Sequence, residues 1–238
     1  MFTMPEKCLV LGLPVHLSSS YSNLAIERLE QKLATHIVTL NAEMAMLGEK
    51  DAKMGKIIKA ADLVIPDGSG VVFYLAMRGH KQKRVPGIEL AQTLIEEVAT
   101  KGSIAFYGGK PEIIKAAVNF WQERIPGISL LFSDGYIDEE GQKQWCQTLQ
   151  KEQPKLILVG LGVPRQEYWI AEHRHICPNS IWIGVGGSFD IWSGTKIRAP
   201  RLFRENNLEW LYRLYQEPWR WRRMLVLPKF FLRSFVEH

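Results

Sequence analysis

An aspartate in a glycine-rich turn is the side chain of this sequence best placed for acid–base chemistry. Residues 63–65 form a short apolar run that Pro66 stops, and Asp67 follows directly, before the Gly-Ser-Gly of residues 68–70. The apolar segment 71–77 is long enough for a helix, so the pattern predicts a strand, a ligand loop and a helix. Ligands of open parallel sheets bind beyond the carboxyl ends of the strands, where Asp67 would be useful as a reacting carboxylate. An aspartate here could instead cap the following helix.

Other polar residues and glycines follow predicted strands in the same way. Thr39 and Asn41 stand two residues apart at the end of an apolar run, and therefore on one face of a strand. Arg84 lies in a basic loop, and the adjacent Gly108 and Gly109 would let a phosphate or a sugar approach the backbone. These residues also have simpler explanations, because Asn41 could merely end its strand and tight turns of any α/β protein need glycine.

Apolar runs alternate along the chain in a way that would bring these strand ends together. Strands are predicted over residues 8–13, 36–41, 63–65, 104–107, 128–132, 156–159 and 181–185. Helices are predicted over residues 23–33, 51–60, 71–77, 88–100 and 166–175, and another begins at Pro111. The helix that begins near Gln166 would aim free amide groups at a bound anion. This rhythm predicts a doubly wound α/β domain, with a mostly parallel sheet and helices on both faces.

Composition restricts the class of protein. The 238 residues are 46% hydrophobic and 11% aromatic, which fits a globular chain and excludes disorder. The three cysteines, Cys8, Cys146 and Cys177, lack the spacing of a disulfide framework or a zinc site. The first residues do not have the pattern of a signal peptide, and no apolar run reaches the roughly 18 to 20 residues of a membrane span. We therefore expect a cytoplasmic protein.

The net charge of +5 is concentrated at the C-terminus. Residues 196–238 carry ten basic and four acidic side chains, a net charge of +6, which leaves −1 for residues 1–195. Within this part a helix with an apolar stripe at Leu208, Leu211, Tyr212 and Tyr215 precedes a segment in which arginine alternates with tryptophan. Such a segment is typical of a surface-lying membrane contact. We predict an α/β domain over residues 1–195 and a basic, helical appendage over residues 196–238.

Nine short segments between residues 36 and 220 carry a family resemblance. They are Thr-Leu-Asn at 39–41, Pro-Asp-Gly-Ser-Gly at 66–70, Arg-Val-Pro-Gly at 84–87, Gly-Gly at 108–109, Asp-Gly-Tyr at 134–136, Gly-Leu-Gly-Val-Pro-Arg-Gln-Glu at 160–167, Gly-Val-Gly-Gly-Ser-Phe-Asp at 184–190, Arg-Ala-Pro at 198–200 and Glu-Trp-Leu-Tyr-Arg at 209–213. Each segment alone is weak, but in this order the chain resembles the WecG/TagA/CpsF glycosyltransferases. These bacterial enzymes transfer an N-acetylmannosamine-type sugar from a UDP donor to a lipid-linked acceptor. The first 35 residues match only loosely.

The resemblance implies a Rossmann-like fold with a C-terminal appendage that binds the membrane, and it implies roles for particular residues. Asp67 would be the catalytic base, and Thr39 would lie beside the reacting centre. The residues implied in substrate binding are Asn41, Arg84, Gly108, Gly109, Gln166, Glu167, Asp190, Arg198, Arg213, Arg220 and Arg223. Among these, Asp190 could equally organise its loop.

The implied reaction is an inverting sugar transfer to a polyprenyl-diphosphate-linked N-acetylglucosamine, in bacterial cell-surface polysaccharide or teichoic acid synthesis. A carboxylate must take the acceptor proton, and positive charge must hold the departing diphosphate. Because no Asp-x-Asp occurs among the six aspartates, we expect arginines and no divalent metal or other cofactor to do this. The expected partners are the UDP-sugar, the lipid-linked acceptor and an anionic inner-membrane surface on its cytoplasmic side, with no nucleic acid; a homo-oligomer is possible.

Two other classes of function are open to a basic α/β chain. A nicotinamide-dependent oxidoreductase of the Rossmann type would need G-x-G-x-x-G at the first strand–helix turn and an acidic residue about 20 positions later, and the sequence lacks this arrangement. A non-enzymatic module could bind membranes or nucleic acid through the basic C-terminal residues alone. That class leaves the polar loops before residue 195 unexplained.

Overall fold

The computed structural model describes residues 5–236, and the side chains of Arg220 and Arg223 lie outside the described part. Within these residues the centre is a six-stranded sheet in which all neighbouring strands are parallel. In spatial order the strands are β4 (Leu63–Pro66), β3 (Thr35–Leu40), β8 (Ile181–Gly184), β7 (Leu156–Gly160), β5 (Ile104–Gly108) and β6 (Leu130–Ser133).

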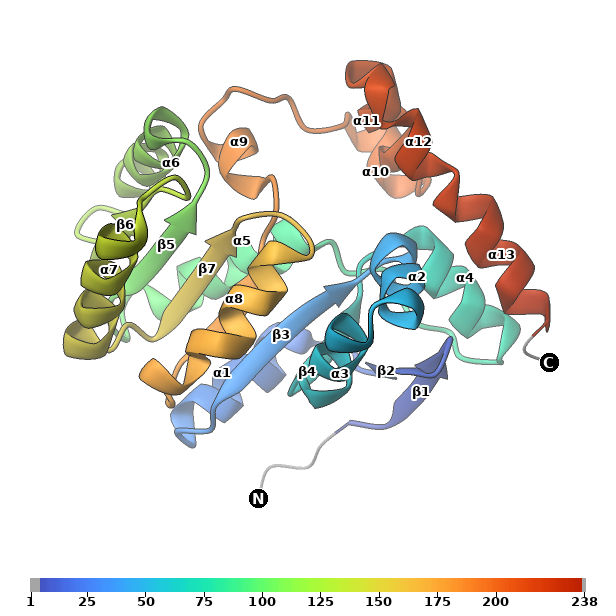
Figure 1. Cartoon of the computed structure of the whole chain (residues 1–238), viewed down its shortest axis with the longest axis horizontal. Coiled ribbons are helices and arrows are strands. Elements are labelled where there is room, and N and C mark those ends of the chain that lie inside the picture. The colour runs from blue at the N-terminus through green and yellow to red at the C-terminus, as the bar shows by residue number, and fades with distance from the viewer. Residues whose placement is uncertain (1–4, 237–238) are drawn as a thin grey trace.

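Helices cover both faces of the sheet, as Figure 1 shows. Both faces need cover because successive residues of a strand point to opposite sides, and here both sides are apolar. On β3, Ile37 packs into one apolar core and Val38 into another. The helices of the first face are α1 (Tyr21–Glu30), α5 (Gly87–Val98), α6 (Pro111–Arg124) and α9 (Ser188–Trp192). Those of the second face are α2 (Ala42–Lys50), α3 (Ala52–Ala60), α4 (Ser69–Met77), α7 (Glu139–Glu152) and α8 (Arg165–His173), the last continuing as a 3-10 turn, η1 (Arg174–Ile176). The predicted doubly wound α/β fold is confirmed.

The first predicted strand is wrong, because residues 8–13 do not form one strand of the main sheet. They belong to a separate antiparallel hairpin of β1 (Lys7–Val10) and β2 (Leu13–His16). Leu11 and Gly12 both have positive φ angles, 49° and 69°, and two such residues reverse the chain with the twist that a hairpin needs. The hairpin contacts the edge strand β4 through His16, whose Nδ1 accepts the N–H of Val64 at 2.9 Å.

The basic C-terminal part is helical, as predicted. Its elements are α10 (Arg201–Glu205), α11 (Glu209–Gln216), a 3-10 turn η2 (Pro218–Arg220), α12 (Trp221–Met224) and α13 (Val226–Val236). In Figure 1 they arch over the carboxyl end of the sheet, and α13 then runs beside α4. Phe230 on α13 is completely buried and packs against the Tyr74 ring of α4. The division of the chain at residue 195 stays a prediction. Between residues 5 and 236, no helix combines the length and the apolarity that crossing a bilayer requires.

Candidate active site

Two adjoining pockets lie where β3, β4 and β8 end. The first, which we call the strand-end pocket, has a volume of about 240 Å³, and its lining includes Thr39, Gln166, Gly184, Gly186, Arg198 and Lys196. The second, the appendage pocket, has a volume of about 160 Å³, and its lining includes Ser69, Gly70, Trp210, Met224, Val226 and Leu227. The residues that line both are Asn41, Glu43, Asp67, Arg84, Glu209 and Arg213. Asp67 therefore lies on a wall that two ligands would share.

Asp67 is held by its backbone at the end of β4. Its N–H donates to the carbonyl of Leu40 at 3.0 Å, and the next residue, Gly68, packs so closely that a Cβ there would lie 2.9 Å from the Asn41 Cβ. Burial raises the pKa of the Asp67 carboxyl, and the opposing charges of Arg84 and Arg213 do not cancel this shift. A raised pKa makes a carboxylate a stronger base.

Arg84 connects the loop of Asp67 to the appendage. Its Nε donates to the backbone carbonyl of Asp67 at 2.5 Å, and its Nη2 lies 3.8 Å from Oδ1 of the same residue. The same Nη2 donates to Glu209 Oε2 at 2.7 Å. Because both ends of the guanidinium are fixed, Arg84 positions Asp67 and at the same time presents positive charge to both pockets.

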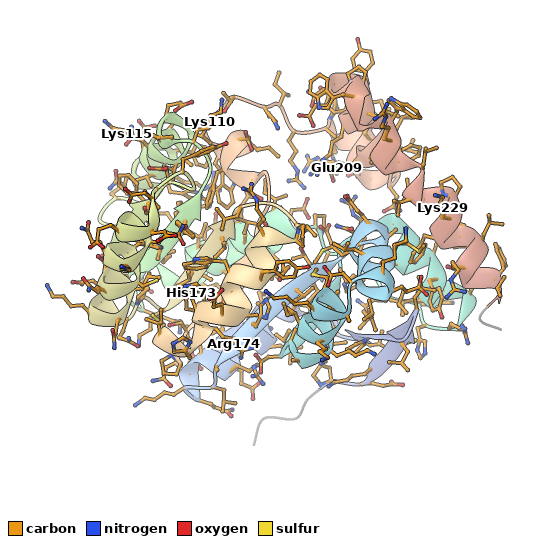
Figure 2. All side chains as sticks on the ribbon, in the orientation of Figure 1. Lys110, Lys115, His173, Arg174, Glu209 and Lys229 are labelled. Atoms are coloured by element: carbon orange, nitrogen blue, oxygen red, sulfur yellow. The ribbon has the colours of Figure 1, made fainter. Side chains whose placement is uncertain are left out.

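Glu209, at the start of α11, was not among the predicted site residues. Figure 2 shows it on the side of α11 that faces the sheet, and only 4% of the residue is exposed. Burial alone would raise the pKa of Glu209, but Arg213, Arg84 and Arg198 outweigh burial, so its pKa lies below the ordinary value. The sequence feature that could have pointed to Glu209 is its spacing of four residues from Arg213 on a predicted helix. In the structure the two side chains form a salt bridge, with Arg213 Nη2 3.2 Å from Glu209 Oε1.

Of the tail arginines predicted to bind substrate, the two with described side chains lie at the strand-end pocket. Arg198 and Arg213 both line it, together with Lys196. Arg198 is bound to Glu89 through Nη2 at 2.5 Å, whereas its buried Nε donates no hydrogen bond to any described residue. These cations could hold an anionic group. The predictions for Arg220 and Arg223 fall on side chains outside the described part.

Thr39 and Asn41 are both brought to the site, from the end of β3. Thr39 is 7% exposed and lines the strand-end pocket. Asn41 caps α2, since its Oδ1 accepts the N–H of Met44 at 3.0 Å, and it also lines both pockets. The strand-ending role of Asn41 and a ligand contact are therefore compatible.

Gln166 and Glu167, neighbours at the start of α8, have different positions. Gln166 lines the strand-end pocket, and its Oε1 accepts the N–H of Gly186 at 3.0 Å. Glu167 is completely buried and lines neither pocket; it binds His36 Nε2 at 3.0 Å and Gln166 Nε2 at 3.0 Å. The substrate contact expected of Glu167 therefore stays a prediction, and the contacts that the structure gives it are with His36 and Gln166. Its partner His36, in the middle of β3, was not predicted, and no spacing in the sequence pointed to it.

Three other predicted residues line neither pocket: Gly108, Gly109 and Asp190. Gly108 has φ of 124°, and a Cβ there would lie 2.6 Å from the backbone of Gly160. The neighbouring N–H of Gly109 donates to the Gly160 carbonyl at 3.2 Å. The glycine pair thus lets the ends of β5 and β7 pack closely. Oδ1 of Asp190 lies 3.9 Å from Nζ of Lys196, and the backbone carbonyl of Asp190 accepts the backbone N–H of Lys196. Asp190 thus organises the loop after α9.

Possible metal ligands do not cluster at this site. In the described part of the chain, no three or more His, Cys, Asp or Glu side chains lie where they could hold a metal ion together. The charged groups around Asp67 are guanidinium groups and carboxylates in salt bridges. Such a set can bind a diphosphate directly through charge-assisted hydrogen bonds.

Proteins that are similar to this chain in sequence are named as glycosyltransferases. The family described as "Glycosyl transferase WecG/TagA/CpsF family" matches residues 8–238. The chain is 35% identical to an N-acetylglucosaminyldiphosphoundecaprenol N-acetyl-beta-D-mannosaminyltransferase of Bacillus spizizenii, over 90% of this chain and 84% of that protein. Proteins of the same name from Bacillus subtilis and Staphylococcus aureus are each 34% identical, over 91% and 82% of this chain and 85% and 77% of theirs. The chain is a glycosyltransferase and belongs to the WecG/TagA/CpsF family.

Proposed function

We propose that this enzyme transfers an N-acetylmannosamine-type sugar, with inversion, from a UDP donor to N-acetylglucosamine carried on a polyprenyl diphosphate. The names of the relatives support the sugar and the acceptor. The observation that carries the proposal is the position of Asp67 on the wall between two pockets, one rich in cations and the other partly apolar. Membership in a glycosyltransferase family leaves no support for the oxidoreductase or the non-enzymatic module.

The strand-end pocket suits the donor. It is bordered by glycine backbone at residues 184, 186 and 187, which lets a ligand approach the strand ends closely. The cations Lys196, Arg198 and Arg213 would bind the diphosphate of UDP and stabilise the charge that develops as it leaves. In this proposal no divalent metal takes part.

The appendage pocket suits the lipid-linked acceptor. Trp210, Met224, Val226 and Leu227 supply apolar lining, and Asp67 and Arg84 supply polar groups at the inner wall. Beyond this pocket α13 exposes apolar residues, Leu232, Phe235 and Val236. Exposed apolar side chains on a basic helix fit a leaflet surface that carries anionic lipid. We therefore propose that the enzyme works on the cytoplasmic face of the plasma membrane, with the prenyl chain entering from the lipid.

The proposed chemistry is a single displacement. The acceptor hydroxyl attacks the anomeric carbon, and a carbon–oxygen bond forms there while the bond from that carbon to the diphosphate oxygen breaks. The hydroxyl proton passes to the Asp67 carboxylate, and the electron pair leaves with UDP. Arg84 keeps Asp67 in place, and Thr39, on the strand-end side, lies near the reacting centre.

Product analysis with a set of UDP-sugars and polyprenyl-diphosphate-linked N-acetylglucosamine tests this function. We expect transfer from UDP-N-acetylmannosamine or a close relative, inverted configuration in the product, and a higher rate with anionic liposomes. Turnover should persist in a chelator such as EDTA. Activity that is lost in the chelator and restored by magnesium or manganese would refute the metal-free mechanism, and the absence of transfer from every UDP-sugar would refute the function.

A further inference from the structure

We propose that His36 and Glu167 form a buried positioning pair, which fixes the carboxamide of Gln166 and, through it, the glycine turn after β8. Neither residue touches substrate; both act on the donor through Gln166 and Gly186. The inference rests on the proposed function, because it assigns these residues to the donor side of the same site.

The orientation of the Gln166 carboxamide follows from its neighbours. The backbone N–H of Gly186 can only donate, so the Gln166 atom 3.0 Å away must be the oxygen. The nitrogen of the same amide then faces Glu167 Oε1 at 3.0 Å, and Glu167 must accept there. Glu167 Oε2 is 3.0 Å from His36 Nε2, and an ionised Glu167 can only accept in this contact. One chain of hydrogen bonds thus runs from β3 through α8 to the turn at the pocket.

Burial makes this chain rigid. Glu167 is 0% exposed, His36 1% and Gln166 2%, so water does not compete for their hydrogen bonds. An acidic group in such a place costs free energy unless its partners are well arranged, and removing it would leave two buried polar groups unsatisfied. Because Glu167 lines neither pocket, its effect on the donor would pass through the geometry of Gln166.

Gly184 shows how little room the Gln166 and Glu167 side chains have. A Cβ on Gly184 would lie 2.3 Å from Gln166 Nε2 and 2.4 Å from Glu167 Oε1, far inside contact distance. Both side chains therefore lie directly against the end of β8. Gly184 and Gly186 also line the strand-end pocket, so a shift of the Gln166 amide would move the lining that the donor contacts.

A double-mutant cycle on the full-length enzyme tests the pair, with kcat/KM for the donor as the first measurement. Glu167→Met replaces the hydrogen-bond-accepting carboxylate with an apolar side chain of similar length, and it should lower kcat/KM by about 10- to 100-fold. Gln166→Ala should have an effect of similar size, and the double variant should be no worse than the poorer single variant. Glu167→Gln can still accept from Gln166, and its amide nitrogen can donate to His36 Nε2 when the imidazole carries its proton on Nδ1, so this variant should stay within about threefold of wild type. Glu172→Met, on an exposed part of the same helix, is the matched control and should be unchanged.

The second measurement is the amide hydrogen exchange of Gly186, which does not depend on activity. Exchange should become faster in Glu167→Met and stay unchanged in Glu167→Gln and Glu172→Met. Should Glu167→Met not fold, His36→Phe removes the far end of the chain and must speed the same exchange. Additive losses in the cycle, or unchanged Gly186 exchange in these variants, would overturn the inference. A wild-type enzyme without transfer but with the expected exchange pattern would overturn the proposed function alone.

Discussion

The guanidinium of Arg84 lies 2.7 Å from the carboxylate of Glu209, a residue 125 positions further along the chain. This ion pair joins the loop that holds Asp67 to the first turn of α11. The appendage is thereby coupled to the carboxyl end of the sheet through a buried contact, and Glu209 also neutralises part of the charge of Arg198 and Arg213. A substitution in α11 should therefore affect the position of the Asp67 loop, and a substitution in that loop should affect the packing of α11.

Asp67→Asn should remove the proposed base without changing the shape of the site. We expect kcat to fall by about 10²- to 10⁴-fold, the usual contribution of a positioned proton acceptor, while UDP binding stays near the wild-type level. Product formation from UDP-N-acetylmannosamine and calorimetry with UDP measure the two quantities. Turnover near the wild-type rate would exclude Asp67 from the mechanism.

The same substitution should make the protein more stable at pH 7. Burial raises the pKa of Asp67 in the folded state above its unfolded value, so the folded chain binds this proton more tightly. As pH rises from the unfolded-state pKa of Asp67 to its folded-state pKa, the free energy of unfolding therefore decreases. At pH values above the folded-state pKa, the ionised Asp67 side chain destabilises the folded protein. Asparagine removes that cost. Thermal unfolding should give a higher midpoint for Asp67→Asn than for wild type at pH 7; a lower midpoint would contradict the raised pKa.

The pH dependence of kcat/KM should report the environment of Asp67. A base must be ionised to accept a proton, so activity should fall as pH drops through the pKa of Asp67, above the ordinary aspartate value of about 3.9. The positive charge of Arg84 lowers this pKa, so Arg84→Met should move the acid limb to higher pH as well as reducing the rate. Rate profiles between pH 4 and 9 measure the shift. An acid limb that moves to lower pH would show that Arg84 does not act on Asp67 in this way.

Glu209→Gln should weaken both stability and turnover. Its carboxylate is buried against Arg84 and Arg213, and its loss removes a counter-ion from both guanidinium groups, at a cost of about 3–5 kcal/mol. Chemical denaturation measures the loss. The matched control is Glu205→Gln, because Glu205 pairs with Arg201 on an exposed face of α10 and should contribute less than about 1 kcal/mol. Equal effects of the two substitutions would contradict the central place of Glu209.

Two phenylalanines of α13 should separate core packing from membrane contact. Phe230 is completely buried, whereas Phe235 is 58% exposed. Phe230→Ala should destabilise the fold by about 3–5 kcal/mol. Phe235→Ala should leave unfolding nearly unchanged and reduce sedimentation with anionic liposomes and the liposome-stimulated part of the rate. Liposome binding that is insensitive to Phe235→Ala, Leu232→Ala and both together would argue against membrane contact through this face.

Local patterns in the sequence were sufficient for much of the scaffold. Short apolar runs, separated by helical segments, predicted the parallel strands from residue 36 onward, and the order of nine motifs predicted the family. The helices α2 and α7 were not predicted; α7 is strongly polar, with few buried residues, and α2 begins directly at the end of a strand. The strand expected at residues 8–13 became a hairpin because backbone angles at Leu11 and Gly12, which hydrophobicity does not encode, reverse the chain.

The residue types and their spacing determined that polar groups stand just beyond strand ends, and hence that Asp67, Thr39 and Arg84 belong to one site. Only the tertiary structure decided which of these groups meet a pocket, since Glu167 and Gln166 are neighbours in sequence but only Gln166 lines one. It also decided that Glu209 joins Asp67 and Arg84. The physical reason is that periodicity is a local property, whereas burial and ion pairing depend on strand order and on how helices pack across long separations in the chain.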